Sequence, residues 1–288
     1  MSQPNKLELS NLNYEGSLEE YLKDFLGLSK SFLKKSGLSK KQLNLSIKPK
    51  DQLYIPINVI NHGKINPNYV GSPIKVIDED EEFIVLSKPA KIHIHPHNYL
   101  DQDTLLNAFY ALNLSSYLNV NRNEYDRGLV YRLDYETSGL CLYAKSDEVY
   151  AKYRNQFHDL VESKEYFVIC KGKCEDALYK DKVNYRGEKK GAGYVVGHGE
   201  YSAFIEVKFI EYNAKENLSL VKVKLYEGIR HQIRIQMAHH GHPILGDELY
   251  KGPKAQRLYL HCHEYKINNK IFRDENLVLF RELFDFDG

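Results

Sequence analysis

Residues 131–145 read YRLDYETSGLCLYAK and place Arg132 and Asp134 directly ahead of a turn and an apolar run. Side chains two positions apart on an extended chain point to the same side, so we expect a strand, a loop over 136–139 and a second, buried strand. An arginine beside an aspartate favours the ionised carboxylate, which suits a nucleophile or an electrostatic stabiliser better than a proton donor. For the short string R-L-D alone, a surface ion pair on a hairpin is the simpler alternative.

The longer string resembles the H-R-L-D-x-x-T-S-G-L-L-L-x-A-K signature of the RluA-type pseudouridine synthases. Further blocks resemble that family in the family's own order: VIDEDEEFIVLSKPAKIHIHP (76–96), KEYFVICKG (164–172), GIRHQIR (228–234), GHPILGD (241–247) and LHC (260–262). Two departures stand out. Tyr131 occupies the family's usual histidine position, and Ile229-Arg230 replaces the usual Arg-Thr.

The resemblance implies an enzyme that isomerises uridine in structured RNA without a cofactor or a metal. Asp134 would attack the flipped uridine at the ribose or at the uracil, two routes that stay open here. Tyr166 would lie against the flipped base and help to remove the carbon-5 proton. Arg234 would pair with Asp134, and Arg132 would enter the RNA stack that the uridine leaves, since chemistry on a stacked base requires its extrusion.

The same resemblance assigns RNA contacts to Arg230, His231 and Gln232. The basic residue has moved one place along the chain to Arg230, which is four residues from Arg234. On a helix this spacing would put both arginines on one side. We predict that helix over 231–240, ending at Gly241, because glycine is favoured directly after a helix.

The pattern of elements predicts an α+β fold with a mixed, largely antiparallel sheet flanked by helices, because strands outnumber helices and lie in adjacent runs. Alternation in residues 221–225 places Val221, Val223 and Leu225 on one face, and a helix should follow Ser146. The predicted organisation is a polar tail (1–15), a small N-terminal α/β RNA-binding-like module (16–60), a linker (61–73) and the catalytic domain (74–288).

The N-terminal region has a segregated charge. Residues 29–50 contain seven lysines and no acid. This distribution fits a phosphate-binding surface, and it fits equally a solvated lysine-rich face. The helices predicted over 17–35 and the strand over 50–55 resemble a compressed RNA-binding module shared with a small-subunit ribosomal protein. We therefore expect RNA contacts from Lys34, Lys35, Lys40 and Lys41.

Composition narrows the remaining possibilities. No apolar run approaches the roughly 18 residues of a membrane span, and the first residues lack the apolar core of a signal peptide. Four cysteines without a C-x-x-C pair do not suggest a disulfide scaffold or a zinc ribbon. We expect a cytoplasmic monomer whose partner is RNA, with large-subunit ribosomal RNA preferred over transfer RNA by analogy with modular family members.

Two other functions are compatible with the residues. One is an RNA-binding protein on the same scaffold that has lost catalysis, although Asp134, Tyr166 and Arg234 are all present. The other is a metal-dependent hydrolase, since three imidazoles can hold zinc. Its histidines would come from two groups: His93, His95 and His97 on one strand face, and His239, His240 and His242 around Gly241. Because both His-Pro pairs match metal-free positions of the family, we expect no metal.

Overall fold

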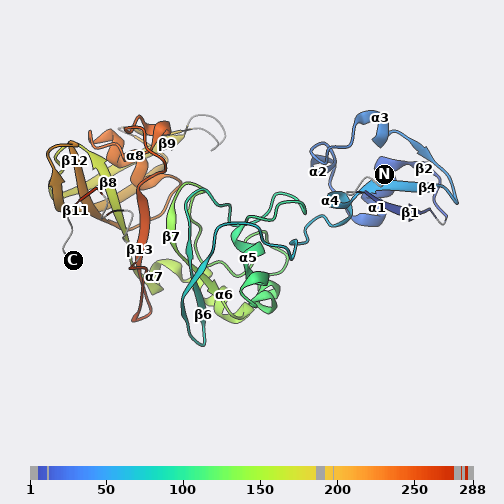
Figure 1. Ribbon diagram of the computed structural model, residues 1–288, viewed down its shortest axis with the longest axis horizontal. Helices are drawn as coiled ribbons and strands as arrows, with labels where there is room; N and C mark the ends of the chain where they lie inside the picture. Colours follow the sequence, from blue (N-terminus) through green and yellow to red (C-terminus); the bar gives the residue numbers. More distant parts are fainter. Residues whose placement is uncertain are drawn as a thin grey trace. The chain divides into compact units, whose positions relative to one another are not determined.

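The computed structural model describes residues 6–11, 13–185, 192–196, 198–275, 280 and 283–284. Two compact units divide the chain (Figure 1): Met1–Val70 with His95–Ala111, and Gly71–Ile94 with Leu112–Gly288. These boundaries differ from the predicted ones, because part of the expected linker packs with residues 95–111. The Asn107 side chain donates a hydrogen bond to the Asn66 carbonyl over 2.8 Å.

The smaller unit is built from short elements. They are β1 (Lys6–Ser10), β2 (Gly16–Ser17), α1 (Leu18–Leu26), α2 (Lys30–Leu33), α3 (Lys40–Leu43), β3 (Ser46–Ile47), β4 (Gln52–Pro56), α4 (Ile57–Ile60) and α5 (Leu105–Ala111). Strand β1 pairs antiparallel with β4, and β2 with β3. The predicted tail over 1–15 is therefore wrong for residues 6–10, where Leu9 packs against the core of this unit and Leu7 is exposed.

Serine caps define the helices of this unit. Ser17 and Glu20 form a capping box at the start of α1, and Ser29 caps α2, so the helices expected over 17–35 are present. A second capping box, formed by Ser39 and Gln42, starts α3. The helices and β4 enclose a separate apolar core that includes Leu22.

The larger unit contains the sheet that carries the candidate site. Its elements are β5 (Lys75–Glu79), β6 (Phe83–Lys88), a 3-10 helix η1 (Ser115–Asn119), β7 (Ser138–Ala144), α6 (Asp147–Asn155), α7 (Phe157–Leu160), β8 (Val161–Lys171), β9 (Ala177–Tyr185), β10 (Gly193–Val196), β11 (Tyr201–Asn213), β12 (Leu218–Leu225), α8 (Gln232–His239), η2 (Glu248–Tyr250), β13 (Leu260–Ile267) and β14 (Lys270–Arg273). No helix in the described part of the chain is both long and apolar enough to cross a bilayer.

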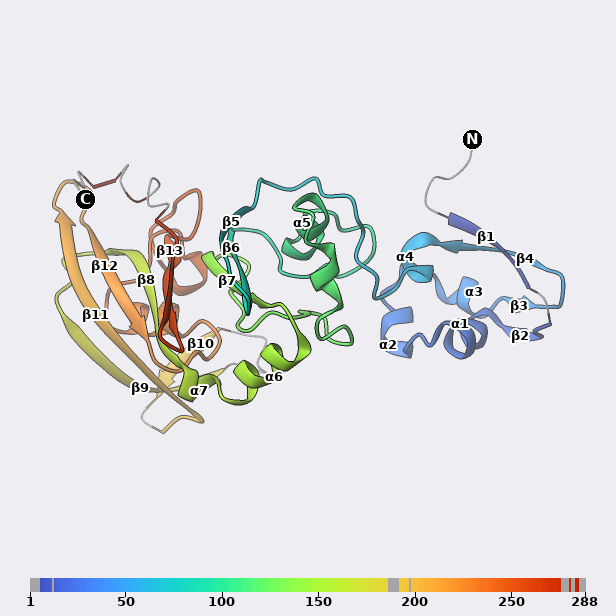
Figure 2. The ribbon, with the colours of Figure 1, turned by 90° about the horizontal axis from the view of Figure 1, so that it is seen from below.

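Ten strands form one mixed sheet within the described residues. Their order is β10-β9-β11-β12-β8-β13-β7-β6-β5, with β14 paired to β13. Figure 2 shows β11, β12 and β8 side by side in its curved half. The predicted alternation in β12 is confirmed, since Val221, Val223 and Leu225 are buried. The predicted α+β class with a largely antiparallel sheet is likewise confirmed.

The one parallel pairing of the described strands joins the two halves of this sheet. Strands β7 and β13 meet through only two residue pairs, His261 with Ser138 and Cys262 with Gly139. Gly139 has a φ of +115°, and an added Cβ would overlap the backbone of Cys262. Glycine is therefore required at this seam, because a side chain would keep the two strands apart.

Helix α8 packs on β10 and β11 and begins one residue later than predicted. His231 precedes it in the left-handed region, with a φ of +57°. Gly241 follows it with a φ of +88°, and the His242 amide donates to the Met237 carbonyl over 2.8 Å. The predicted glycine terminus is thus confirmed.

The strand predicted ahead of Asp134 is absent from the described residues. The segment before Asp134 was expected to be a strand, yet it forms only an isolated bridge between Leu129 and Tyr143. Arg132 and Asp134 lie instead in a loop that ends at β7. The buried strand after the turn is confirmed as β7.

Replacing Gly139 by alanine should lower the free energy of unfolding by about 3 kcal/mol or more, because it combines a steric clash with an unfavourable φ. The corresponding fall in Tm is about 6–12 °C. Gly241→Ala is the matched control: its φ is also positive, but no atom lies within 4 Å of the added Cβ. It should cost only about 1–2 kcal/mol. If both variants lowered Tm by the same amount in thermal denaturation, glycine would not be specifically required at the seam.

Candidate active site

A cavity of about 870 Å³ opens in the larger unit between the loop before β7, strand β8 and the start of α8. Its lining includes the four residues to which the sequence assigned chemistry: Arg132, Asp134, Tyr166 and Arg234. Arg230, His231 and Gln232 line it as well. Residues up to 102 positions apart in the sequence are thus brought to one hollow.

Asp134 presents its carboxylate to this cavity, with 33% of its side chain exposed. Its Oδ2 atom lies 3.9 Å from Arg234 Nη1 and 3.7 Å from His231 Nε2. These separations exceed an ordinary hydrogen bond, so neither partner is bound directly to the carboxylate. The expected Arg234–Asp134 pair is therefore a looser, through-space contact.

Burial raises the pKa of Asp134 above that of an ordinary aspartate. Four neighbouring cations oppose the rise, in decreasing order Arg234, Arg230, Lys88 and Arg132. The sequence suggested that one adjacent arginine keeps this carboxylate ionised, whereas the pKa of Asp134 depends on burial and on four cations. The environment disfavours the negative charge, and several cations share in stabilising it.

Arg234 is held by Asp247, which the sequence did not single out as a site residue. Arg234 Nε and Nη2 donate to the two carboxylate oxygens of Asp247 over 2.7 and 2.8 Å. Both side chains are buried, and the Tyr250 ring lies 5.3 Å from the guanidinium carbon. This two-bond pair fixes the plane of the guanidinium and leaves Nη1 directed at Asp134.

Tyr166 lies in the cavity wall on β8 and is 3% exposed. Burial, with a smaller effect of Cys262, raises the pKa of Tyr166 well above its ordinary value. The phenol therefore stays protonated near neutral pH and is a weak base. Its position fits packing against a base or donating a hydrogen bond better than removing a proton.

Arg132 and Arg230 both reach the cavity, but not through the regular elements that were predicted. Arg132 lies in the loop, is 70% exposed and sits 3.4 Å from Asp126. Arg230 precedes α8, so the expected i,i+4 relation to Arg234 on one helix does not hold. The two side chains nevertheless place positive charge at the cavity, which suits contact with phosphate.

His231 and Gln232 are more enclosed than RNA contacts usually are. Burial and the nearby arginines lower the pKa of His231 to about 3, so its ring is neutral. The Gln232 amide oxygen accepts from the Gly228 and Ile229 amides over 2.9 and 3.1 Å, and its nitrogen donates to Glu227 over 2.9 Å. Gln232 therefore shapes the turn before α8.

Two further residues position the Asp134 loop. Lys88 is buried and donates to the carbonyls of Pro89, Ile92 and Tyr135 over 2.9–3.2 Å. Burial lowers the pKa of Lys88 to about 8. Tyr131 donates to the Gly228 carbonyl over 3.0 Å and so ties this loop to the turn before α8. The sequence showed Lys88 within a Lys-Pro pair and Tyr131 as a departure, without showing these contacts.

Comparison with known proteins agrees with this geometry. The sequence profile of the family described as RNA pseudouridylate synthase matches residues 82–239, more than half of the chain. The chain belongs to this family. It is therefore an RNA pseudouridine synthase, an isomerase, as the resemblance in its sequence implied.

Curated relatives of this synthase lie at about 30% identity. An uncharacterized RNA pseudouridine synthase, YhcT, of Bacillus subtilis is 30% identical over 240 residues, covering 82% of this chain and 76% of the relative. The ribosomal large subunit pseudouridine synthase D of Borreliella burgdorferi is 31% identical over 68% of this chain and 60% of its own length. An uncharacterized RNA pseudouridine synthase of Aquifex aeolicus is 34% identical, and the match spans 56% of its length.

Solved structures share the fold of the synthase at lower identity. Human RNA pseudouridylate synthase domain containing 1 superposes with a TM-score of 0.57 at 18% identity, over 71% of this chain and 84% of the human one. Human RNA pseudouridylate synthase domain containing 4 superposes with a TM-score of 0.55 at 17% identity, over 73% of this chain and 91% of the human one. At this level of identity, the superpositions show a shared fold.

The four lysines that were expected to contact RNA lie in the smaller unit of the synthase. Lys34 is the C-cap of α2, Lys35 follows it, and Lys40 and Lys41 open α3. All four are exposed. Their side chains are thus available to phosphate, while the role itself stays a prediction.

The histidines of the synthase do not form the two groups considered from the sequence. Residues 93–97 form no strand, and His93 packs on Tyr135 with ring centroids 4.4 Å apart. In the described residues, His239 and His240 gather with Asp181, whereas His242 lies with Cys170 and Cys174. No grouping of three histidines near Asp134 supports the hydrolase alternative within the part of the chain described.

Proposed function

We propose that this synthase isomerises specific uridines in structured RNA, with Asp134 as the catalytic carboxylate. The observation that carries the proposal is the position of Asp134 in the cavity wall, faced by Arg234 and flanked by Tyr166. A flipped uridine has room in a hollow of about 870 Å³. Extrusion of a stacked base costs a few kcal/mol, which contacts in such a pocket can offset.

The reaction is balanced without a redox partner. The N-glycosidic bond breaks, the uracil turns while held in the cavity, and a carbon–carbon bond forms between the ribose and carbon 5. The proton of carbon 5 leaves and the former glycosidic nitrogen gains one, so substrate and product have the same atoms. Asp134 acts on the ribose or on the uracil, and both routes need the ionised carboxylate as a nucleophile.

The surrounding side chains divide the remaining work. Arg234, fixed by Asp247, stabilises the carboxylate and orients it without binding it tightly. Tyr166 packs against the base as a neutral phenol. Arg132, mostly exposed, enters the gap that the flipped uridine leaves in the RNA, and Arg230 meets a phosphate.

Large-subunit ribosomal RNA is the preferred target, and transfer RNA the second. The support comes from relatives, since several are named ribosomal large subunit pseudouridine synthase D. The chain spans about 54–60% of the length of these relatives. Mapping pseudouridines in cellular RNA with and without the gene would identify the target. Absence of any lost site would favour an RNA-binding protein without catalysis.

Asp134→Asn should abolish pseudouridine formation while RNA affinity is retained, because asparagine keeps the shape but lacks the nucleophilic charge. Tritium release from RNA labelled at carbon 5 of uridine measures pseudouridine formation, and filter binding measures RNA affinity. The variant should melt no lower than the parent at neutral pH, since burial disfavours the charge that is removed. Asp176→Asn, on an exposed carboxylate, is the control and should stay active. More than a trace of product from Asp134→Asn would refute the assignment.

The rate should fall as the pH is lowered through the pKa of Asp134, which burial raises, so the loss begins at a higher pH than for an ordinary aspartate. Arg230→Gln removes an opposing cation and should move this acid limb to still higher pH. Arg132→Gln should move it less, because Arg132 has the smaller effect. Single-turnover rates at saturating RNA across a pH series test the order. A shift to lower pH in Arg230→Gln would contradict it.

Replacing Lys34, Lys35, Lys40 and Lys41 by glutamine should weaken binding to structured RNA and flatten its salt dependence. Each phosphate neutralised contributes about 0.7–0.9 to the slope of log affinity against log salt, so the slope should fall by about 3. Chemistry on bound RNA should change little. Lys75→Gln with Lys215→Gln, two exposed lysines of the larger unit, serves as control. If the four lysines are only a solvated face, the slopes will be equal.

A further inference from the structure

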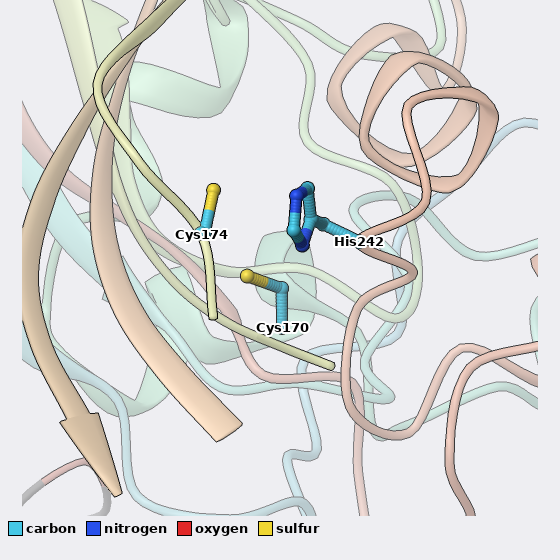
Figure 3. A group of neighbouring side chains, drawn as sticks. All are labelled: Cys170, Cys174 and His242. Carbon is cyan, nitrogen blue, oxygen red and sulfur yellow. The ribbon is translucent and has the colours of Figure 1, made fainter. Parts of the chain in front are cut away.

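Cys170, Cys174 and His242 form a cluster that the proposed reaction does not use. Cys170 is in β8, Cys174 follows that strand, and His242 follows α8. Figure 3 shows the imidazole directed toward the two cysteines. Both thiols are buried, with exposures of 0% and 1%, while His242 is partly exposed. None of the three lines the cavity that contains Asp134.

The ligand atoms of the cluster are already close together. Two sulfurs and one imidazole nitrogen lie within 4.8 Å of one another. Zinc bound tetrahedrally, with Zn–S near 2.3 Å and Zn–N near 2.0 Å, would separate such atoms by about 3.5–3.8 Å. The side chains would therefore need to move by about an ångström only.

Backbone contacts hold the three residues in place. The loop after α8 pairs with the end of β8, where the Lys171 amide donates to the Pro243 carbonyl over 3.0 Å, and Cys170 bridges Ile244. The Cys174 amide donates to the Ser219 hydroxyl over 2.9 Å, which fixes the turn after β8. The cluster thus rests on hydrogen-bonded backbone.

The hydrogen bond of His242 favours a metal-binding tautomer. Its Nδ1 lies 3.0 Å from the Lys171 carbonyl oxygen, and a carbonyl can only accept, so Nδ1 carries the proton. The lone pair is then on Nε2. Metal-binding histidines commonly donate their other ring proton to a carbonyl or carboxylate in this way.

We propose that Cys170, Cys174 and His242 bind a zinc ion, with water as the fourth ligand. Two thiolates and one imidazole are a donor set that zinc prefers over magnesium or calcium. The ion would link β8 to the loop that follows α8. Strand β8 contains Tyr166, and helix α8 contains Arg234. Its role is structural, because the proposed isomerisation has no step that uses a metal.

This site departs from the expectation that the chain binds no metal. The sequence contains C-x-x-x-C followed by a histidine 68 residues later, a spacing that matches no common zinc pattern. The other grouping, Asp181 with His239 and His240, is more exposed and offers no thiolate. There the His240 ring also stacks on Tyr179 with centroids 3.8 Å apart. We therefore assign zinc to the cysteine cluster.

Metal analysis of the full chain tests the proposal. Protein from zinc-supplemented cells, purified with a thiol reductant, should contain one zinc ion per chain by plasma mass spectrometry. Cys170→Ser with Cys174→Ser, and separately His242→Ala, should lower the zinc content at least about ten-fold. Cys141→Ser is the matched control, because Cys141 is equally buried in β7 but distant in sequence from the cluster. It should keep its zinc.

A second measurement does not depend on the variants folding. Metal-free parent protein titrated with Co²⁺ should develop a near-ultraviolet thiolate-to-cobalt absorption band that zinc then removes. Zinc at about 100 times its Kd should raise Tm by roughly 5–10 °C. Adding EDTA should reverse this rise and leave the turnover rate at low temperature unchanged.

Three results would overturn the zinc site. The first is the absence of both zinc and a cobalt–thiolate band in the parent protein. The second is undiminished zinc in the folded double-serine variant. The third is a Cys170–Cys174 disulfide in chain purified without a reductant, which would make the pair a redox element. None of these results bears on Asp134→Asn, so failure of the zinc site leaves the proposed reaction to its own test.

Discussion

The two-bond pair between Arg234 and Asp247 is the interaction on which the candidate site depends. A buried guanidinium without a partner would be strongly unfavourable, and Asp247 removes that penalty while fixing the plane of the charge. Only then can Nη1 point toward Asp134 from 3.9 Å. The arginine therefore stabilises the carboxylate without a direct hydrogen bond that would occupy the oxygens of Asp134.

The loop that carries Asp134 is positioned from both sides. On one side, buried Lys88 donates hydrogen bonds to three backbone carbonyls, one of which, that of Tyr135, belongs to the loop. On the other side, Tyr131 binds the loop to the turn before α8. Gln232 shapes that turn, because its side-chain oxygen accepts from two backbone amides and its side-chain nitrogen donates to Glu227. Tyr131 thereby gives a physical meaning to one departure from the family signature: its hydroxyl supplies a contact between the two segments that face each other across the cavity.

Local order was predictable where neighbours in sequence determine it. The caps at Ser17 and Ser29, the glycine after α8 and the alternation of β12 each depend on residues a few positions apart. The wrong predictions concern partners distant in sequence. Residues 6–10 are a strand only because β4 pairs with them, whereas the segment before Asp134 meets β7 through a single bridge between Leu129 and Tyr143.

The candidate site shows the same limit. Motifs identified which residues would gather around Asp134, because a signature preserves residue types in order. They did not reveal that Asp247 binds Arg234, that Lys88 is buried beneath the loop, or that His242 lies with two cysteines. Each of these contacts is set by how distant segments pack, which residue types alone do not specify.

The parallel seam between β7 and β13 has a consequence for how the molecule folds. It joins residues such as Ser138 and His261, which are 123 positions apart, whereas most other pairings of the sheet connect strands closer in sequence. Closing so long a loop costs chain entropy before any contact compensates for it, so such pairings form late. Asp134 precedes β7, while Tyr166 and Arg234 belong to the other half. We therefore expect the candidate site to assemble in a nascent chain only after β13 has been synthesised and has docked.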